Sequence, residues 1–217
     1  PVGMDTLAAA MARSAQRTSV PVALHLDHGH TYEGVMKAVR WGFTSVMFDG
    51  SALSLADNLK KTKEITRIAH SLGISVEGEL GYIGQSEAAA DLPPAEAITA
   101  EIAADFVTKT KIDALAVAVG TNHGAVKVTG GLNIMRLAEL NHLVDVPLVL
   151  HGGSKLSRED CRLVIDNGIC KINIATDMSL SAAERLKMEL AKAPAANYIH
   201  LMTSVKKGVK DLVRKYM

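Results

Sequence analysis

Three histidines of this 217-residue chain each close a short apolar run, and each is followed by a glycine. They are His28, His123 and His151. One such histidine alone is most simply a half-buried structural side chain, but three at equivalent positions favour a shared metal ion. Three imidazoles that leave a fourth coordination position open are typical of catalytic zinc. We therefore predict a divalent metal site built from these three side chains.

A carboxylate stands directly beside one of these histidines. Asp27 precedes His28, so it lies within reach of a substrate hydroxyl bound near the metal, as general acid–base catalysis requires. The other carboxylates predicted at the same rim are Asp49, Glu77, Glu79 and Glu87. Any one of them is ordinarily a capping or solvated loop charge. Glu79 is also a candidate for orienting a ligand or binding a second cation.

Two segments of small and polar residues are suited to binding a phosphate. Their members are Gly152, Gly153 and Ser154 in the first segment, and Asn173, Ile174, Ala175 and Thr176 in the second. Either segment alone is a weak signal, since paired glycines usually mark only a turn. In α/β barrels, however, phosphate often binds after the last two strands, through backbone N–H groups and a helix N-terminus. Their paired position therefore predicts a phosphate site.

Strand-like and helical stretches alternate along the chain and position all of these residues. The predicted strands are 20–27, 45–49, 75–80, 114–120, 147–151 and 171–176. The predicted helices are 4–15, 31–41, 55–72, 98–110, 134–143, 158–167, 179–190 and 205–216. Strict alternation indicates a parallel sheet with right-handed crossovers. Functional residues of such sheets gather at the carboxyl ends of the strands, where all six predicted strands end in polar, ligand-competent residues.

Composition fits one α/β domain over residues 1–217. Hydrophobic residues make up 48% of the chain and aromatic residues only 4%, which suits a core of small aliphatic side chains around parallel strands. A complete (β/α)8 TIM barrel has eight strands, and six are visible in this sequence. The Gly/Ala-rich stretch 81–97 contains two consecutive prolines, and a loop of this length inside a domain is usually functional.

Charge and hydropathy exclude other classes of protein. The chain has 24 basic and 23 acidic residues, a formal net charge of +1, and no basic stripe, which argues against a nucleic-acid partner. The longest apolar runs are far shorter than the roughly 20 residues of a membrane-spanning helix, and no membrane association or signal peptide is expected. Cys161 and Cys170 are expected as free thiols of a cytoplasmic protein.

Six segments of the chain resemble those of the class II, zinc-dependent ketose-bisphosphate aldolases, and the fructose- and tagatose-bisphosphate aldolase branch in particular. These segments are LHLDHG (24–29), FDGS (48–51), EGELG (77–81), GTNHG (120–124), LHGGS (150–154) and KINIATD (171–177). They occur in the family's order and at about its spacing. The resemblance implies a TIM barrel with about the first two strands absent from this chain, assembled as a homodimer or homotetramer.

The resemblance also implies a role for each candidate metal ligand and substrate-binding residue. The positions that match the catalytic zinc ligands are His28, His123 and His151. Asp49 and Glu79 match second-metal or outer-shell positions, so a second divalent or monovalent cation is expected there. The positions that match the dihydroxyacetone phosphate site are Gly124, Gly152, Gly153, Ser154, Asn173, Ile174, Ala175 and Thr176.

The implied reaction is the retro-aldol cleavage of a ketose 1,6-bisphosphate. Zinc polarises the C2 carbonyl, Asp27 takes the C4 hydroxyl proton, and the C3–C4 bond breaks. Glu87 matches the carboxylate that moves a proton at the enediolate carbon. The products are dihydroxyacetone phosphate and glyceraldehyde 3-phosphate, and both fructose and tagatose bisphosphate remain open as substrates.

Two other functions compete with this interpretation. A metal-dependent phosphosugar epimerase would use a similar barrel, but it is expected to combine two carboxylates with two histidines around its metal. A non-catalytic sugar-phosphate-binding paralogue would bind metal and ligand without turnover. The adjacent pair Asp27 and His28 argues against this second alternative, because a protein that only binds has no need of an acid/base beside the metal.

Overall fold

The structure, a computed structural model, describes residues 3–81, 98–120, 131–154 and 156–217. Six strands in this part of the chain form one parallel sheet, in which spatial order follows sequence order. The strands are β1 (His25–Gly29), β2 (Ser45–Phe48), β3 (Ser75–Leu80), β4 (Ala114–Val117), β5 (Leu148–Leu150) and β6 (Ile169–Ile172). Each successive pair is joined through a helix, as the alternating sequence pattern predicts.

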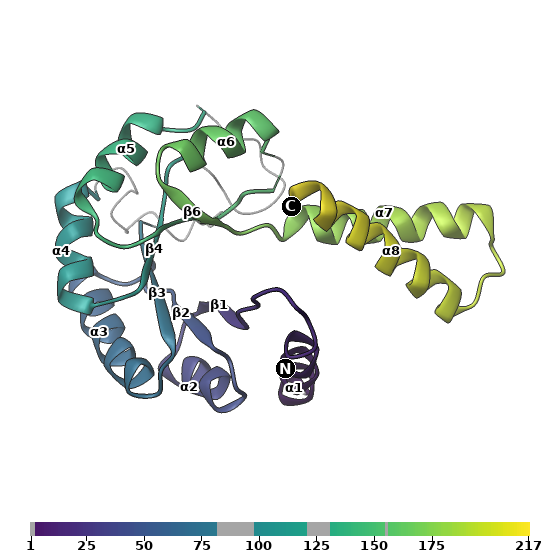
Figure 1. Cartoon of the computed structure of the whole chain (residues 1–217), viewed down its shortest axis with the longest axis horizontal. Helices are drawn as coiled ribbons and strands as arrows, with labels where there is room; N and C mark the ends of the chain where they lie inside the picture. Colours follow the sequence, from purple (N-terminus) through teal and green to yellow (C-terminus); the bar gives the residue numbers. More distant parts are fainter. Residues whose placement is uncertain (1–2, 82–97, 121–130, 155) are drawn as a thin grey trace.

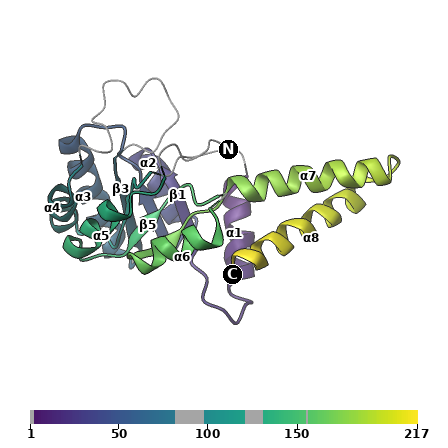
Figure 2. The same cartoon turned by 90° about the horizontal axis from the view of Figure 1, so that it is seen from above.

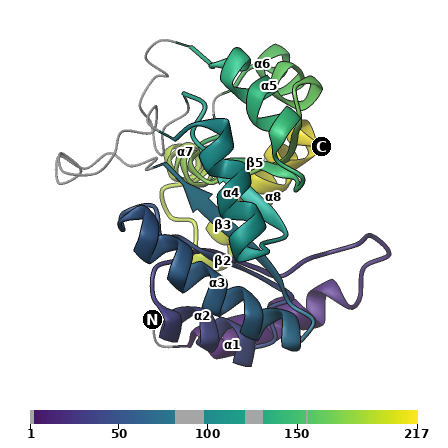
Figure 3. The same cartoon turned by 90° about the vertical axis from the view of Figure 1, so that its left-hand side faces the viewer.

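Helices line one face of this sheet in an arc (Figure 1). The helices are α1 (Met4–Ala15), α2 (Tyr32–Arg40), α3 (Leu55–Ser71), α4 (Ala100–Thr110), α5 (Ile134–Leu143), α6 (Arg158–Asp166), α7 (Thr176–Lys192) and α8 (Tyr198–Tyr216). From the side, α3 and α4 lie in front of the strands that they cover (Figure 3). The last two helices instead form a hairpin that extends away from the sheet (Figure 2).

The two faces of the sheet have different chemistry because successive strand residues point to opposite sides. In β3, Val76 and Leu80 belong to the large apolar core against the helices. Glu77 and Glu79, at the alternate positions, point to the other face and are nevertheless almost fully buried. A small second apolar cluster of Met47, Ala116 and Val149 lies on that inner face. The concave face therefore combines a thin apolar floor with buried charge.

Curvature brings the two edge strands of the sheet toward each other. His25 in β1 and Lys171 in β6 both approach Glu77 in β3, with nitrogen-to-carboxylate distances of 3.5 Å and 2.8 Å. A flat six-stranded sheet would hold its edges apart, since neighbouring strands are about 4.8 Å from each other. The fold is a half-barrel of six parallel strands in the described residues, so the predicted parallel α/β architecture is confirmed at this level.

Side-chain caps define where most helices begin. Thr31, Ser54, Thr99, Asn133, Ser157 and Asn197 each accept a hydrogen bond from a backbone N–H of the helix that follows. Such caps satisfy amide donors that have no partner inside the helix. α7 differs, because its N-cap residue, Ala175, supplies no side-chain hydrogen bond. The hydroxyl of Ser154, after β5, accepts from the Asp177 amide in its place, at 3.2 Å.

Several predicted boundaries are wrong. The first strand begins at His25 rather than at residue 20, since residues 20–24 form no strand and Pro21 lacks an amide hydrogen. β6 covers Ile169–Ile172 instead of 171–176, and the residues after it turn into α7. The last helix begins seven residues before the predicted start, and the signal for that start is the Asn197 cap. No helix in the described part of the chain is long and apolar enough to cross a membrane.

Gly73 and Gly168 follow α3 and α6, as predicted, and both have positive φ values of 72° and 111°. A Cβ at Gly73 would meet nothing within 4 Å, whereas one at Gly168 would lie 2.2 Å from the Asn141 side chain. We expect Gly73→Ala to cost about 1–2 kcal/mol of unfolding free energy from the left-handed backbone alone. Gly168→Ala should cost more, because the Asn141 side chain must also move. Urea unfolding of both variants measures this difference, and equal losses would contradict it.

Candidate metal and catalytic site

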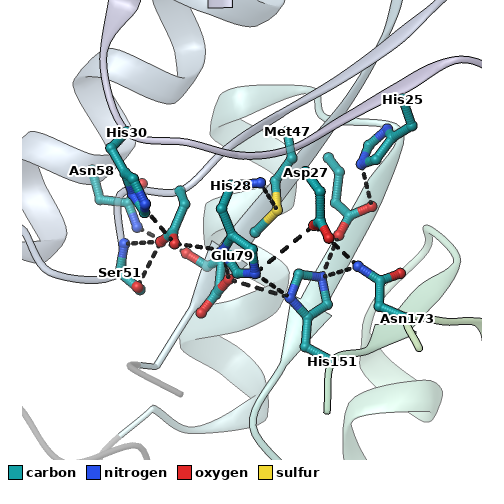
Figure 4. Close-up of polar contacts among 12 residues, drawn as sticks. His25, Asp27, His28, His30, Met47, Ser51, Asn58, Glu79, His151 and Asn173 are labelled. Carbon is teal, nitrogen blue, oxygen red and sulfur yellow. Dashed lines mark hydrogen bonds and ion pairs between the residues drawn. The ribbon is translucent and has the colours of Figure 1, made fainter. Parts of the chain in front are cut away.

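Polar side chains from several strand ends converge on the concave face (Figure 4). Asp27 and His28 come from β1, Glu79 from β3 and His151 from the end of β5, while Asn173 follows β6. The carboxyl ends of parallel strands lie at the same edge of a sheet, so residues far apart in sequence meet there. The predicted clustering at the strand ends is therefore present for these side chains.

His28 occupies an unusual backbone position and makes a short contact to Asp49. Its φ is 52°, in the left-handed region, and the β1–β2 register shifts between Leu26 and Gly29. The His28 Nδ1 atom lies 2.7 Å from Asp49 Oδ2. Because an ionised carboxylate only accepts hydrogen bonds, Nδ1 carries the proton and Nε2 points away from Asp49. This hydrogen bond also raises the pKa of His28.

His151 is oriented by a second carboxylate. Its Nε2 atom lies 2.8 Å from Glu77 Oε1, and its Nδ1 atom lies 3.1 Å from His28 Nε2. The Glu77 carboxylate accepts the Nε2 proton, so the lone pair on Nδ1 faces His28. Two ring nitrogens bound to one tetrahedral zinc at 2.0–2.1 Å would lie about 3.3 Å apart. The observed separation of 3.1 Å fits a shared ion.

Glu79 supplies the observation that best tests whether a cation fits. Its Oε2 atom is buried and accepts no hydrogen bond within the described residues. The same atom lies 3.7 Å from His28 Nδ1 and 3.9 Å from His151 Nδ1. An orphaned buried carboxylate oxygen beside two imidazoles is a position that a cation would satisfy. Mixed nitrogen and oxygen donors suit a divalent ion such as zinc.

Asp49 and Glu79 are neighbours with opposite tendencies to ionise. Burial and the nearby Asp49 charge raise the pKa of Glu79 to about 8. Burial alone would also raise the pKa of Asp49, but hydrogen bonds from His28 and Ser51 outweigh it and lower that pKa to about 2. Asp49 accepts from both the Ser51 amide and the Ser51 hydroxyl, at 3.1 Å and 2.6 Å. One carboxylate is thus ionised and the other protonated at neutral pH, unless a cation joins them.

Two overlapping groups in the described part of the chain have ligand atoms close enough to hold a metal ion. The first group is Asp27, His28 and His151, and the second is His28, Asp49 and Glu79; within each group all ligand atoms lie within 4.8 Å of one another. The structure therefore brings together four of the five predicted metal residues. The fifth, His123, lies outside the described residues, as do the predicted residues Glu87 and Gly124.

Asp27 stands at the boundary between the metal group and an open cavity. Its carboxylate Oδ1 lies 3.8 Å from His28 Nε2 and accepts a hydrogen bond of 3.1 Å from the Asn173 amide. Half of the Asp27 side chain is exposed, in contrast to the buried carboxylates around it. A carboxylate that is held in place yet open to solvent is able to exchange a proton with a bound molecule.

A cavity of about 580 Å³ adjoins this carboxylate, and all but one of the predicted phosphate residues within the described part of the chain line it. Those residues are Gly152, Ser154, Asn173, Ile174, Ala175 and Thr176. Gly153 is the exception, since its amide donates to the Asn173 carbonyl. The uncapped start of α7 contributes to the same wall, although Ser154 Oγ accepts from the Asp177 amide at 3.2 Å. A helix N-terminus of this kind favours an anion.

Sequence reasoning missed three residues of the site: Glu77, Lys171 and His25. Glu77 was interpreted as an ordinary rim charge, yet its side chain is only 3% exposed and contacts both His151 and Lys171. Burial alone would raise the pKa of Glu77, but these two partners lower it. Burial lowers the pKa of His25, which contacts Ser45 Oγ at 2.8 Å. The available signal was the alternation of Glu77 with Glu79, which places both carboxylates on one face.

Comparisons with known proteins agree with this geometry. Residues 2–217 match the family model described as "Fructose-bisphosphate aldolase class-II". The chain therefore belongs to the class II fructose-bisphosphate aldolase family. The predicted resemblance is confirmed, and the predicted aldolase class is supported at this level.

Three solved aldolase structures are similar to this chain in sequence and in fold. The YdjI aldolase from Escherichia coli K12 is 34% identical with a TM-score of 0.81, over 96% of this chain and 72% of that one. A putative fructose-1,6-biphosphate aldolase from Coccidioides immitis is 28% identical with a TM-score of 0.87, over 100% of this chain and 77% of that one. The fructose-bisphosphate aldolase of Campylobacter jejuni shares the fold, with a TM-score of 0.75 over 98% of this chain and 75% of that one. It is 23% identical in sequence.

The raised pKa of Glu79 predicts how the metal-free protein responds to pH. The folded state keeps a proton on Glu79 up to about pH 8, whereas the unfolded chain loses it near 4.5. Unfolding free energy should therefore fall as pH rises between these values, by about 1.4 kcal/mol per pH unit from this group. Glu79→Gln removes this contribution. Urea unfolding of the chelator-treated wild type and the Glu79→Gln variant at pH 5 to 8 measures the difference. Parallel dependences of unfolding free energy on pH in the two proteins would contradict the contribution of Glu79.

Proposed function

We propose that this chain is a zinc-dependent aldolase that cleaves a ketose 1,6-bisphosphate, of fructose or tagatose, to dihydroxyacetone phosphate and glyceraldehyde 3-phosphate. One observation carries the proposal: the half-exposed Asp27 carboxylate lies beside His28 and His151 at the mouth of a cavity. Membership of the class II family and two aldolase structures above 25% identity support the reaction class. The predicted enzyme is thus a carbon–carbon lyase.

The proposed catalytic metal ligands are His28, His123 and His151, of which His123 is assigned from the sequence alone. Asp49 accepts a hydrogen bond from His28 Nδ1, and Asp49 and Glu79 together form the proposed position of a second cation. A zinc ion bound by these histidines supplies a Lewis acid that polarises the substrate carbonyl at C2. The Asp49 and Glu77 carboxylates each hold one nitrogen of the two described rings, and the other nitrogens, His28 Nε2 and His151 Nδ1, face each other 3.1 Å apart.

Asp27 performs the proton transfer in this proposal. Its carboxylate accepts the proton of the C4 hydroxyl, the C4–O bond becomes the aldehyde carbonyl, and the C3–C4 electron pair remains on C3. The three-carbon fragment is then an enediolate, and protonation at C3 yields dihydroxyacetone phosphate. Glu87 is the proposed donor of that proton, on the basis of its position in the sequence. The Asn173 amide donates a hydrogen bond to Asp27 Oδ1 and so restrains this carboxylate.

The cavity wall between the β5 end and α7 is the proposed site of the dihydroxyacetone phosphate group. Gly152, Ser154, Thr176 and the uncapped α7 N-terminus all border the cavity. A phosphate there would interact with backbone amides and with the positive end of the helix dipole. Gly124 joins this group by sequence alone.

The sequence-based predictions of a cytoplasmic location and of a homodimer or homotetramer form part of the same proposal. The family match and the absence of a membrane-spanning helix in the described residues agree with a protein that works on small phosphosugars. Oligomerisation stays a prediction, which sedimentation of the purified chain measures directly.

An assay of the chain against both bisphosphates tests the reaction. We expect zinc-loaded protein to release dihydroxyacetone phosphate, detected through its enzymatic reduction and the loss of NADH absorbance. Chelation of the metal should abolish this release and added zinc should restore it, whereas borohydride with substrate should not inactivate the protein. Cleavage that persists after complete removal of metal would contradict the proposal. Zinc-loaded protein that cleaves neither bisphosphate would contradict it as well.

Asp27→Ala tests the proposed acid/base. We expect zinc stoichiometry to remain at the wild-type value, because His28 and His151 keep their carboxylate partners, while cleavage falls by about 10²- to 10⁴-fold. Asp211→Ala, an exposed carboxylate on α8, is the matched control and should retain full activity. Full activity of the Asp27 variant would remove this residue from the mechanism.

A further inference from the structure

Lys171 connects two parts of the site that have separate chemical tasks. It projects from β6, and its ammonium donates one hydrogen bond of 2.8 Å to Glu77 Oε2 and another of 2.8 Å to Asn173 Oδ1. Glu77 contacts the proposed metal ligand His151, while Asn173 contacts the proposed acid/base Asp27 and also lies 3.1 Å from His151 Nε2. One charged group therefore lies at the junction of the two contacts.

On the metal side, Lys171 fixes the orientation of the Glu77 carboxylate. The Glu77 carboxylate is buried, with one oxygen on His151 Nε2 and the other on Lys171. A carboxylate held at both oxygens cannot rotate away from the imidazole, so the His151 Nε2 proton stays on the Glu77 side. The Nδ1 lone pair then points toward His28 Nε2, 3.1 Å away. Second contacts of this kind typically set the tautomer of a metal-binding histidine.

On the acid/base side, Lys171 fixes the orientation of the Asn173 amide. An ammonium only donates hydrogen bonds and a carboxylate only accepts them. The amide oxygen must therefore face Lys171, and the amide nitrogen must face Asp27 Oδ1, which lies 3.1 Å from it. Without the ammonium the amide would lose the partner that opposes a flip, and a flipped amide would turn its oxygen toward Asp27.

We propose that Lys171 is a positioning residue that holds the His151 ring and the Asp27 carboxylate in register through Glu77 and Asn173. The proposal deepens the aldolase function above and rests on it for the roles of His151 and Asp27. A lysine suits this task because its compact ammonium donates in three directions, whereas the planar fork of arginine suits two oxygens of one partner. The Lys171 side chain is 38% exposed and borders the cavity, so the position is also open to a substituted side chain.

Lys171→Met tests the metal side without requiring turnover. In the metal-free protein, ¹⁵N spectra of the histidine rings should show His151 in one tautomer for the wild type and in a mixture for the variant. Zinc affinity, measured by competition with a chelator, should fall by about 10- to 100-fold. Lys37→Met removes an exposed lysine paired with Glu33 on α2 and should change neither readout. Lys171→Arg, which keeps the charge but not the geometry, should recover only part of the loss.

Turnover of zinc-saturated protein tests the acid/base side. We expect kcat to fall by about 10- to 100-fold in Lys171→Met with a smaller change in KM, because Asp27, which Lys171 holds through Asn173, acts on the reacting atoms. The losses of kcat from Lys171→Met and Asn173→Ala should not add in the double variant. The losses of zinc affinity from Lys171→Met and Glu77→Gln should not add either. A raised KM with unchanged kcat and an unchanged His151 tautomer would overturn the proposal and make Lys171 a substrate contact. Additive losses would overturn it too.

A folding defect in Lys171→Met is anticipated, because it leaves Glu77 with one cation fewer. The double variant Lys171→Met, Glu77→Gln lacks the uncompensated charge of Glu77. Its zinc affinity and tautomer populations are compared with those of Glu77→Gln alone. Equal zinc affinity and equal tautomer populations in these two proteins are expected if Lys171 acts through Glu77, and a further loss would contradict that route. If the wild type binds zinc but cleaves neither bisphosphate, the proposed function fails, while the tautomer and zinc-affinity results still decide the positioning role.

Discussion

The buried carboxylate of Glu77 is the interaction on which the rest of this structure depends. A charge taken out of water is costly unless oppositely charged or hydrogen-bonding groups surround it. Here its partners come from β5 and β6, with His25 of β1 close by. Those strands can reach one side chain on β3 only if the sheet curls. The contacts to Glu77 therefore require the curvature of the half-barrel and also set the geometry of the site.

A second group of charges, beside the first, explains why the concave face suits a cation. Asp49 is ionised through its hydrogen bonds, and its charge helps to keep Glu79 protonated. A divalent ion near Glu79 would replace its proton and offset the repulsion between the Asp49 and Glu79 carboxylates. Metal binding and the ionisation of Glu79 are thus coupled, because this side chain is protonated at neutral pH without a cation and must lose its proton to bind one.

The helix that begins beside the cavity, α7, lacks the local cap with which most described helices begin. Most described helices begin with a side chain that satisfies their first amides, as Ser157 does for α6 with a full capping box. α7 begins beside the cavity with Ala175 and lacks such a cap. Ser154 Oγ accepts from the Asp177 amide in place of a local cap, so the positive end of the α7 dipole stands at the cavity, where it favours an anion. The same residues therefore connect β6 to α7 and line the cavity.

The sequence by itself determined the alternating strand and helix order, the family, and the strand ends at which Asp27, His28 and His151 stand. These follow from local periodicity and motifs, which need no knowledge of distant contacts. Only the tertiary structure decided the partners: which carboxylate orients which imidazole, and that Lys171 joins Glu77 to Asn173. Strand alternation shows which face a side chain occupies, but the stagger and curvature that bring it against a residue some 90 positions away arise from packing of the whole sheet.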